Sequence, residues 1–297
     1  MERQVEASIV TPASVWPRIS IITPSFNQAG FLERTLCSVL DQNYPNLEYI
    51  VIDGGSTDGS VEIIKKYEDR LAYWVSEPDG GQSQALNKGF ERATGEVIGW
   101  LNSDDLYHSG TLLHVGEWFA EHPQHNVFYG GLSLIDSQDR VHDAVWAGTN
   151  APRYTFWVGL DVHQQSLFWR RELMDQIGMI DETMRFSMDR DFIVRLLLHG
   201  RAGRTLRYLG MFRLHEDAKT ATMVEQSWYE NRIIRDRYCH QLPLPKMPMG
   251  LSKLWLRTQR IGKVLVDAPP LYFAFKLGRR IGLTPPVSWL GGELSGR

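Results

Sequence analysis

The chain has 297 residues, 43% of them hydrophobic, with ten Trp and twelve Phe, which is enough for a packed core and excludes general disorder. Two cysteines, Cys37 and Cys239, are too few for a disulfide framework and have no metal-ligand spacing. The sequence contains no run of eighteen apolar residues, so no membrane-spanning helix is expected, and Met1 to Trp16 lacks the apolar stretch of a secretory signal. We therefore expect a cytoplasmic protein.

The first 120 residues alternate strand and helix patterns. Helices are predicted over about 29–41 and 82–93, and Ser56 to Asp58 offer N-caps for a further helix that runs through Tyr67. Apolar runs predict strands at Ile19–Ile22, Leu47–Ile52, Leu71–Ser76 and Val97–Leu101. This order predicts right-handed crossovers and the α/β fold class, with a mostly parallel central sheet flanked by helices.

The pattern changes beyond Asn126. Strand-like runs occur at Val127–Gly130, Leu132–Ile135 and His163–Trp169. Helices are expected at about Arg171–Ile177, Asp189–His199 and Val224–Cys239. The Pro-rich stretch Leu242 to Pro248 indicates a linker into the last segment of the chain.

Three of the predicted strands end in polar clusters. These clusters are Thr23-Pro24-Ser25-Phe26-Asn27, Asp53-Gly54-Gly55-Ser56-Thr57-Asp58 and Asn102-Ser103-Asp104-Asp105. Because ligands of parallel α/β sheets bind at the carboxyl ends of the strands, the clusters are expected to meet in one crevice. Two of them carry carboxylates, which suits a cation together with a phosphorylated ligand.

Asp104 and Asp105 are the strongest local signal. One carboxylate could hold Mg²⁺ or Mn²⁺, which take a few carboxylates plus substrate phosphate oxygens, while the other reaches a second group. The alternative is that one of them caps a helix beginning near Ser109. Similarly, the Asp53 cluster could be ordinary turn chemistry, Phe26 a core aromatic, and Lys88 a solvated helix residue.

Taken together, the segments resemble family 2 glycosyltransferases of the GT-A fold, which use nucleotide-activated sugars. The resemblance covers about Ile19 to Thr222 and is carried by the order and spacing of weak motifs. The matching stretches are Ile21–Asn27, Val51–Gly59, Gly81–Gly89, Trp100–Asp105, His163–Arg171, Gly178–Glu182 and Met188–Asp191.

The resemblance assigns roles to individual positions. It implies donor binding by Pro24, Phe26, Asn27, Asp53 and Lys88, with Pro24 and Phe26 lining the base pocket and Asp53 bonding the base edge. It implies that Asp104 touches the ribose, that Asp105 holds a metal on the diphosphate, and that His215 lies near this metal. Asp189 falls at the general base. Two positions depart from the family pattern: Met188, where an acidic residue is common, and Asn102, the amide in the usual Asp-x-Asp.

The resemblance further implies an inverting reaction. An acceptor hydroxyl needs a base to take its proton, and a cation neutralises charge on the leaving diphosphate. The expected function is transfer of a sugar from a nucleotide sugar to a glycan or lipid-linked acceptor in surface polysaccharide synthesis. A UDP-sugar is the expected donor. The alternatives are a sugar-nucleotide pyrophosphorylase, whose Gly-rich basic loop this chain lacks, and a non-catalytic nucleotide-sugar or glycan-binding partner.

The charge of the chain is uneven along its length. Residues 1–245 carry a net charge of −10 and residues 246–297 carry +7, which together give −3. On a helical wheel Leu251, Leu254 and Trp255 share one face, opposite Lys253 and Arg257. This pattern suits peripheral attachment to an anionic membrane surface at the inner face of the cell membrane. The alternative is a helical subdomain packed on the body; nucleic acid is not expected, because the body is acidic.

These patterns predict three parts of the chain. Residues 1–18 form an N-terminal extension, residues 19–242 the glycosyltransferase domain, and residues 243–297 a basic helical C-terminal extension. Within the domain we expect a nucleotide-binding half, 19–120, and an acceptor-binding half, 121–242.

Overall fold

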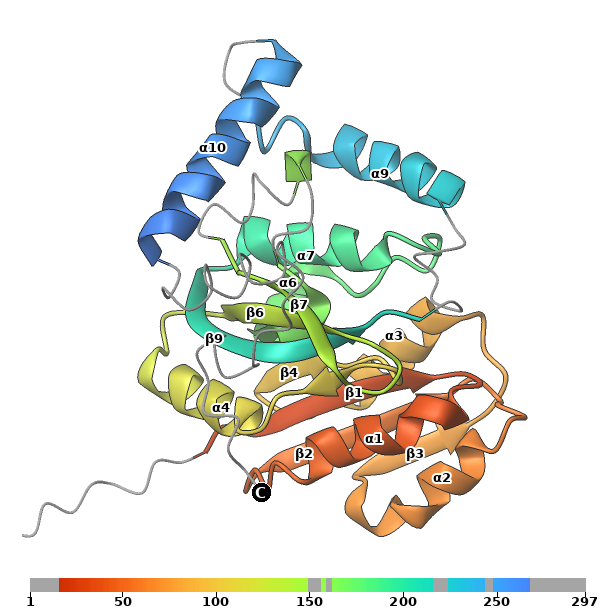
Figure 1. The fold of residues 1–297 in the computed structure, drawn as a ribbon. Helices are drawn as coiled ribbons and strands as arrows, with labels where there is room; N and C mark the ends of the chain where they lie inside the picture. Colours follow the sequence, from red (N-terminus) through yellow and green to blue (C-terminus); the bar gives the residue numbers. More distant parts are fainter. Residues whose placement is uncertain (1–15, 149–155, 159–161, 216–223, 244–247, 268–297) are drawn as a thin grey trace, which may run out of the picture.

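The computed structural model describes residues 16–148, 156–158, 162–215, 224–243 and 248–267, with side chains of the last range described as far as Thr258. Most of the predicted N-terminal extension and the tail beyond residue 267 lie outside these ranges. The described chain forms an α/β body with α9 and α10 at the top (Figure 1).

The first half alternates strands and helices as the sequence predicts. Its elements are β1 (Ile19–Ser25), α1 (Ala29–Leu40), β2 (Leu47–Asp53), α2 (Ser60–Lys66), η1 (Glu68–Arg70), β3 (Tyr73–Ser76), α3 (Gln82–Arg92), β4 (Val97–Trp100), β5 (Leu106–Tyr107) and α4 (Thr111–Glu121). Helix α2 begins at Ser60, just past the N-cap residues expected at Ser56 to Asp58. The reason is that Asp58 accepts hydrogen bonds from Ser60 N and Ala29 N, which ties the preceding loop to the start of α1.

The second half contains more strand than the sequence indicates. Its elements are β6 (Val127–Ile135), β7 (Val141–Val145), η2 (Gln164–Ser166), β8 (Leu167–Arg170), α6 (Arg171–Ile177), α7 (Met188–His199), β9 (Ala202–Arg213), α9 (Val224–Tyr238) and α10 (Met249–Asp267). The two runs expected before residue 136 form the single strand β6. The strand expected from His163 begins only at Leu167, after a 3-10 turn, and β9 is not predicted.

One sheet runs through both halves of the described chain. Its strand order is β3-β2-β1-β4-β8-β6-β9-β5, with β7 paired to β6. The first four strands are parallel, as expected, and β6 pairs in parallel with β9. Strand β8 lies antiparallel between β4 and β6, so the sheet crosses the predicted boundary at residue 120 without a break.

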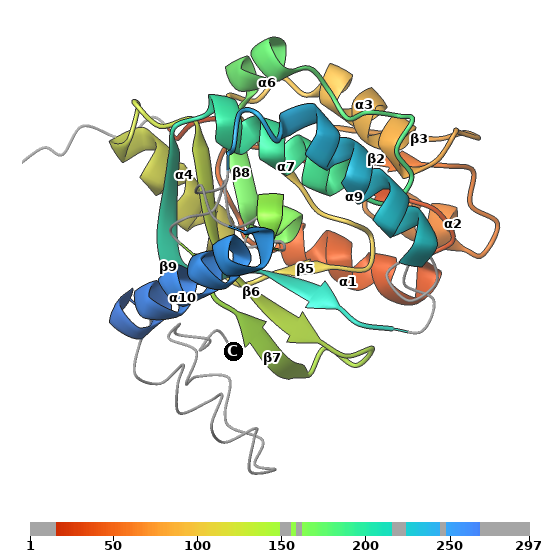
Figure 2. The same cartoon turned by 90° about the horizontal axis from the view of Figure 1, so that it is seen from above.

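Helices cover both faces of this sheet. The core on one face includes buried residues of α1, α2 and α4, and the core on the other face includes those of α3, α6 and α7. Seen from above, α9 crosses over α7 (Figure 2). The contact between α3 and β1 requires a glycine, because a Cβ at Gly89 would lie 2.4 Å from Ile22 Cγ2.

Helix α10 is amphipathic in its described part. Ser252 and Leu256 are buried, whereas Leu251 and Leu254 are 56% and 55% exposed and Trp255 is 38% exposed. Among the described helices, none combines the length and the apolar character that crossing a membrane requires.

Candidate active site

The loop after β4 brings together three of the predicted site residues, Asp104, Asp105 and His215. Asp105 is fully buried. Its Oδ1 accepts a hydrogen bond from Arg213 N at 3.0 Å, and its Oδ2 accepts bonds from Gln165 Nε2 at 2.8 Å and Asn102 Nδ2 at 3.3 Å. Burial, and then the charge of Asp104, raise the pKa of Asp105 well above its usual value. The Asp105 carboxyl is therefore enclosed by protein donors.

Asp104 lies in a more open setting than Asp105. Its side chain is 21% exposed, and its Oδ2 lies 3.1 Å from His215 Nε2. The His215 ring also packs against Phe31 of α1, with the ring centroids 5.0 Å apart. A carboxylate oxygen and an imidazole nitrogen are thus adjacent at the ends of β4 and β9.

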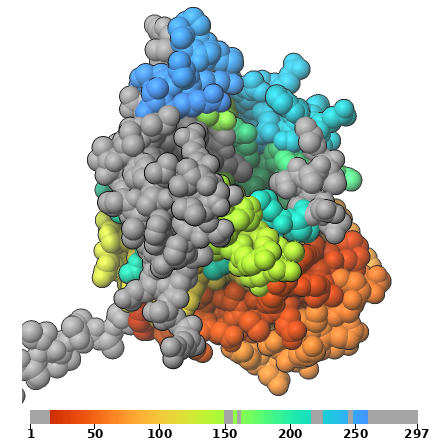
Figure 3. All heavy atoms as spheres, in the orientation of Figure 1, coloured from red at the N-terminus to blue at the C-terminus, as the bar shows by residue number. Residues whose placement is uncertain are grey.

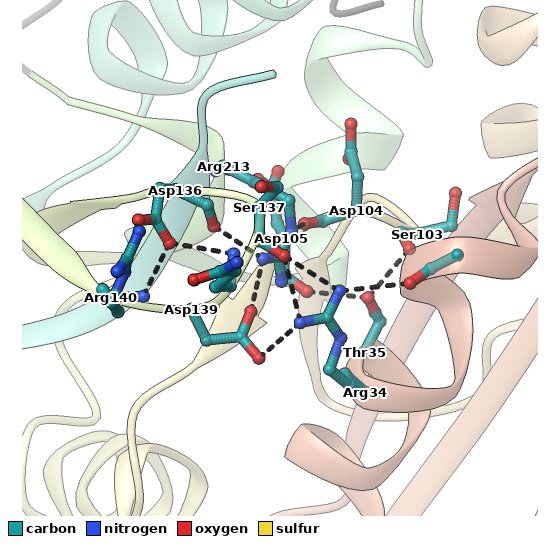
Figure 4. A network of polar contacts seen from close by, with 12 residues as sticks. Arg34, Thr35, Ser103, Asp104, Asp105, Asp136, Ser137, Asp139, Arg140 and Arg213 are labelled. Carbon is teal, nitrogen blue, oxygen red and sulfur yellow. Dashed lines mark hydrogen bonds and ion pairs between the residues drawn. The ribbon is translucent and has the colours of Figure 1, made fainter.

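Arg213, which the sequence analysis missed, fixes the backbone beneath this pair. It is fully buried, and its Nε donates to Asp104 O at 2.6 Å while its guanidinium stacks on Phe31. Its Nη1 pairs with the carboxylate of Asp139 in the β6–β7 turn, and the other oxygen of Asp139 pairs with Arg34 Nη1 at 2.8 Å (Figure 4).

The Asp139 contacts join the hairpin to α1. In the space-filling view the hairpin surface lies directly against the surface of the N-terminal elements (Figure 3). The predicted cation region is therefore held from α1, from the β6–β7 turn and from β9 at once.

The loop after β2 is organised around Asp53, which is fully buried. Its carboxylate accepts hydrogen bonds from Gly55 N, Ser56 N, Ser56 Oγ and Ser76 Oγ, at 2.5–3.1 Å. Ser56 Oγ in turn accepts a bond from Asn27 N, and Asn27 Oδ1 accepts one from Thr57 N. Asn27 adopts φ = 52°, a left-handed conformation that Asn tolerates. Asp53 and Asn27 thus hold the loop after β2 against the loop after β1.

The other predicted donor-binding residues lie around these loops. Pro24 is buried in β1, where it pairs with Ile52, and Phe26 is 59% exposed just beyond the strand. Phe26 is therefore no core aromatic. Lys88, on α3, forms an ion pair with Glu77 at 2.6 Å, so its amine has a partner within the protein.

Asp189, the predicted base, lies in the first turn of α7 and is partly buried. Its Oδ1 accepts a hydrogen bond from Arg190 N at 2.7 Å. Burial raises the pKa of Asp189 to about 6; Arg190 opposes this shift and the charge of Glu230 adds to it. By contrast, both oxygens of the Asp191 carboxylate have protein partners, Arg195 Nε at 2.8 Å and Tyr238 OH at 3.0 Å.

Helix α3 connects the two parts of the candidate site. Gln82 Nε2 donates to Asn102 Oδ1 at 2.7 Å, and Asn102 also bonds Asp105. The next residue, Ser83, contacts Met188 Sδ at 2.7 Å, directly before Asp189. The N-terminus of α3 therefore spans from the end of β4 to the start of α7.

The side chains present fit a divalent cation only in part. Within the described ranges no group of three His, Cys, Asp or Glu side chains could hold a metal ion. Asp104 and His215 supply an oxygen and a nitrogen, and phosphate oxygens of a substrate would have to complete the shell, as Mg²⁺ sites commonly require.

Carboxylates and an imidazole gathered at the strand ends, with a separate carboxyl of raised pKa, mark a candidate ligand and catalytic site of an α/β fold. Comparison with known proteins makes this specific. The model of glycosyl transferase family 2 matches residues 20–178, and the chain belongs to this family. It is therefore a transferase.

The relatives support the same family. An uncharacterized glycosyltransferase of Mycobacterium tuberculosis (strain ATCC 25618 / H37Rv) is 34% identical over 187 residues, which cover 61% of this chain and 70% of the relative. The PGL/p-HBAD biosynthesis glycosyltransferase of Mycobacterium bovis (strain BCG / Pasteur 1173P2) is 27% identical over 257 residues, covering 85% of this chain and 94% of the relative.

Solved structures confirm the GT-A fold. The structure of S. aureus TarS 1–349 in complex with UDP-GlcNAc matches 90% of this chain and 82% of its own, with a TM-score of 0.62 and 18% identity. A longer TarS structure is covered over 50% of its length. The mannosyltransferase PcManGT of Pyrobaculum calidifontis, in complex with GDP-Man and Mn²⁺, has a TM-score of 0.51 at 19% identity.

Proposed function

We propose that the chain transfers a sugar, with inversion, from a nucleotide sugar to a hydroxyl of a glycan or lipid-linked acceptor in surface polysaccharide synthesis. The single observation that carries this proposal is Asp189, a carboxyl of raised pKa that α3 links to the end of β4. A UDP-sugar is the proposed donor, since TarS was solved with UDP-GlcNAc.

Asp189 is suited to act as the base. With a pKa of about 6 it is mostly ionised at pH 7 and still basic enough to accept a proton. As the acceptor oxygen attacks the anomeric carbon, its proton passes to Asp189, and the bond from that carbon to the diphosphate oxygen breaks. One base and one displacement give inversion.

For the cation, Mg²⁺ or Mn²⁺, we propose Asp104 and His215 as the protein ligands, in place of the Asp105 expected from the sequence. The burial of Asp105 and its four donors, with Gln164 Nε2 at 3.4 Å as the fourth, support this revision, because a ligand must turn a lone pair toward the metal. A cation held there would neutralise charge on the leaving diphosphate. Asp105 would orient the loop that carries Asp104.

For the nucleotide, we propose that exposed Phe26 stacks on the base above the loop formed with Asn27. A direct bond from Asp53 to the base edge would require this loop to open, since Asp53 is fully buried. Its four donors support a role in holding the loop. Pro24 would line the pocket, and Lys88 would reach the donor only by leaving Glu77.

We propose further that α10 attaches the protein to the inner face of the cell membrane. The exposed side chains of Leu251, Leu254 and Trp255 support this over packing on the body, and Arg257 is exposed beside them. Apolar burial and attraction to anionic lipid would act together.

The test of the function is release of nucleoside diphosphate from a panel of sugar nucleotides, with Mg²⁺ or Mn²⁺ and candidate acceptors. We expect acceptor-dependent release from one donor, and release slower by about 10²- to 10⁴-fold from Asp189→Asn. Formation of pyrophosphate or of a nucleoside triphosphate would favour the pyrophosphorylase, and donor binding without turnover would favour the non-catalytic alternative.

A further inference from the structure

Helix α9 places a buried carboxylate against the turn that precedes Asp189. Glu230 is 1% exposed, and it accepts hydrogen bonds from the backbone N–H groups of Arg185 at 2.8 Å, Phe186 at 2.9 Å and Ser187 at 2.6 Å. Gln226 Nε2 adds a fourth bond at 2.7 Å. Each oxygen of this buried carboxylate is satisfied by hydrogen bonds, so the contact is a specific part of the fold.

This contact holds the turn that leads into α7, including the N-cap residue of the helix. The N-cap of α7, Ser187, makes no side-chain capping bond, so the N–H groups at this end need another partner. Of these groups Glu230 binds the N–H of the N-cap, Ser187, from a different helix, and its other two backbone donors, Arg185 and Phe186, lie in the turn before α7. Its negative charge also suits the positive end of the α7 dipole.

The residue after Asp189 is tied to the same helix. Arg190 Nη1 donates to Asn231 Oδ1 at 2.9 Å, and Arg190 Nη2 donates to Phe156 O at 2.7 Å. The chain on both sides of Asp189 is therefore bound by two consecutive residues of α9.

We propose that Glu230 is a positioning residue for Asp189: it holds the turn 185–187 and thereby the carboxylate that takes the acceptor proton. The proposal rests on the function proposed above. Glu230 itself need not touch any substrate, since its carboxylate is buried.

The charges around Asp189 give this role a measurable signature. Arg190, on α7, lowers the pKa of Asp189, and Glu230, on α9, raises it; burial is the largest influence. Burial opposes ionisation of Glu230 too, but its hydrogen bonds from Gln226 and the turn hold its pKa below the usual value. Removing the charge of Glu230 should therefore make Asp189 more acidic.

The experiment compares Glu230→Gln and Glu230→Asp with Glu225→Gln, which removes the same charge from an exposed position on α9. Amide hydrogen exchange at 185–187 and the kinetics of sugar transfer are measured in each. Both Glu230 variants should exchange faster and lose about 10- to 100-fold in kcat, with little change in the donor KM. The acid limb of the pH profile should move to lower pH in Glu230→Gln, while Glu230→Asp, which keeps the charge, should retain it.

The outcomes separate this proposal from the proposed function. If Glu230→Gln matches Glu225→Gln in exchange and in pH profile while Asp189→Asn is inactive, the positioning role is wrong. If Asp189→Asn transfers sugar like the wild type, the base assignment itself fails. If Glu230→Gln does not fold, unchanged exchange and kcat in Glu230→Asp would overturn the positioning role.

Discussion

Replacing Asp189 by Asn should lower turnover by orders of magnitude and at the same time stabilise the fold. The pKa of Asp189 rises from 3.8 to about 6 in the folded protein, mainly through burial. A group whose pKa is higher in the folded state stabilises that state only while protonated. This contribution is complete below pH 3.8 and is lost as the pH rises through 6. Above that range the ionised carboxylate is a net cost.

The size of this cost follows from the shift. A shift of about two pKa units corresponds to about 3 kcal/mol at high pH. Roughly half of the stabilisation present at low pH has already been lost at pH 5, and the partial exposure of Asp189 makes the whole effect smaller. The free energy of unfolding of Asp189→Asn, relative to wild type, should therefore increase by about 1 kcal/mol between pH 5 and pH 8.

The assay is urea unfolding of both proteins at the two pH values, combined with turnover at pH 7. Turnover should fall by about 10²- to 10⁴-fold, the usual share of a general base. Asp175→Asn, on the exposed face of α6, is the matched control and should change neither quantity. A stability difference between wild type and Asp189→Asn that is independent of pH would refute the argument, because Asp189 would then have an ordinary pKa.

Three further variants test the cation site, the hairpin contact and α10. Asp104→Asn should abolish transfer and EDTA should reproduce the loss, whereas full activity in EDTA would exclude metal dependence. Asp139→Asn should lower the free energy of unfolding by about 2–3 kcal/mol, because it removes the carboxylate that pairs with the buried guanidinium of Arg213 while tolerating the left-handed backbone at this position. Arg140→Gln, which removes an exposed pair, should cost under about 1 kcal/mol, and equal losses would refute the difference. The double variant Leu254→Glu, Trp255→Glu should lose cosedimentation with anionic vesicles at low salt, since each buried apolar side chain adds roughly 1.5–3 kcal/mol; absence of wild-type binding would end the membrane proposal.

Local sequence was sufficient for β1 to β4 and for α1 to α3, whereas the short strand β5 and the 3-10 turn η1 were not predicted. The runs ending at Ser25, Asp53 and Trp100 are buried along nearly their whole length and rich in β-branched and aromatic residues, so an unbroken apolar run predicts a buried strand directly. The polar residues at their ends locate the loops of the site. The same reasoning places Asp189 at the start of a helix.

Other features depend on partners far away in sequence. Strand β9 carries exposed residues over its first half, from Ala202 to Arg207, so it lacks the pattern of a buried strand. In the sequence, Arg213 and Glu230 cannot be told from ordinary surface charges. Their burial is explained only by their neighbours in space, Asp139 and the 185–187 turn. Adjacent aspartates are equally ambiguous, because sequence alone does not say which of Asp104 and Asp105 is enclosed.

The position of β8 has a consequence for protein engineering. Strand β8 comes from the second half of the chain but pairs with β4, and Gln165, just before it, bonds Asp105 of the first half. A chimera joined near residue 120 would combine a β4 and a β8 that had not evolved together. It would also give Asp105 an unmatched set of donors. Chimeras between relatives are therefore better made by exchanging surface segments than by exchanging halves.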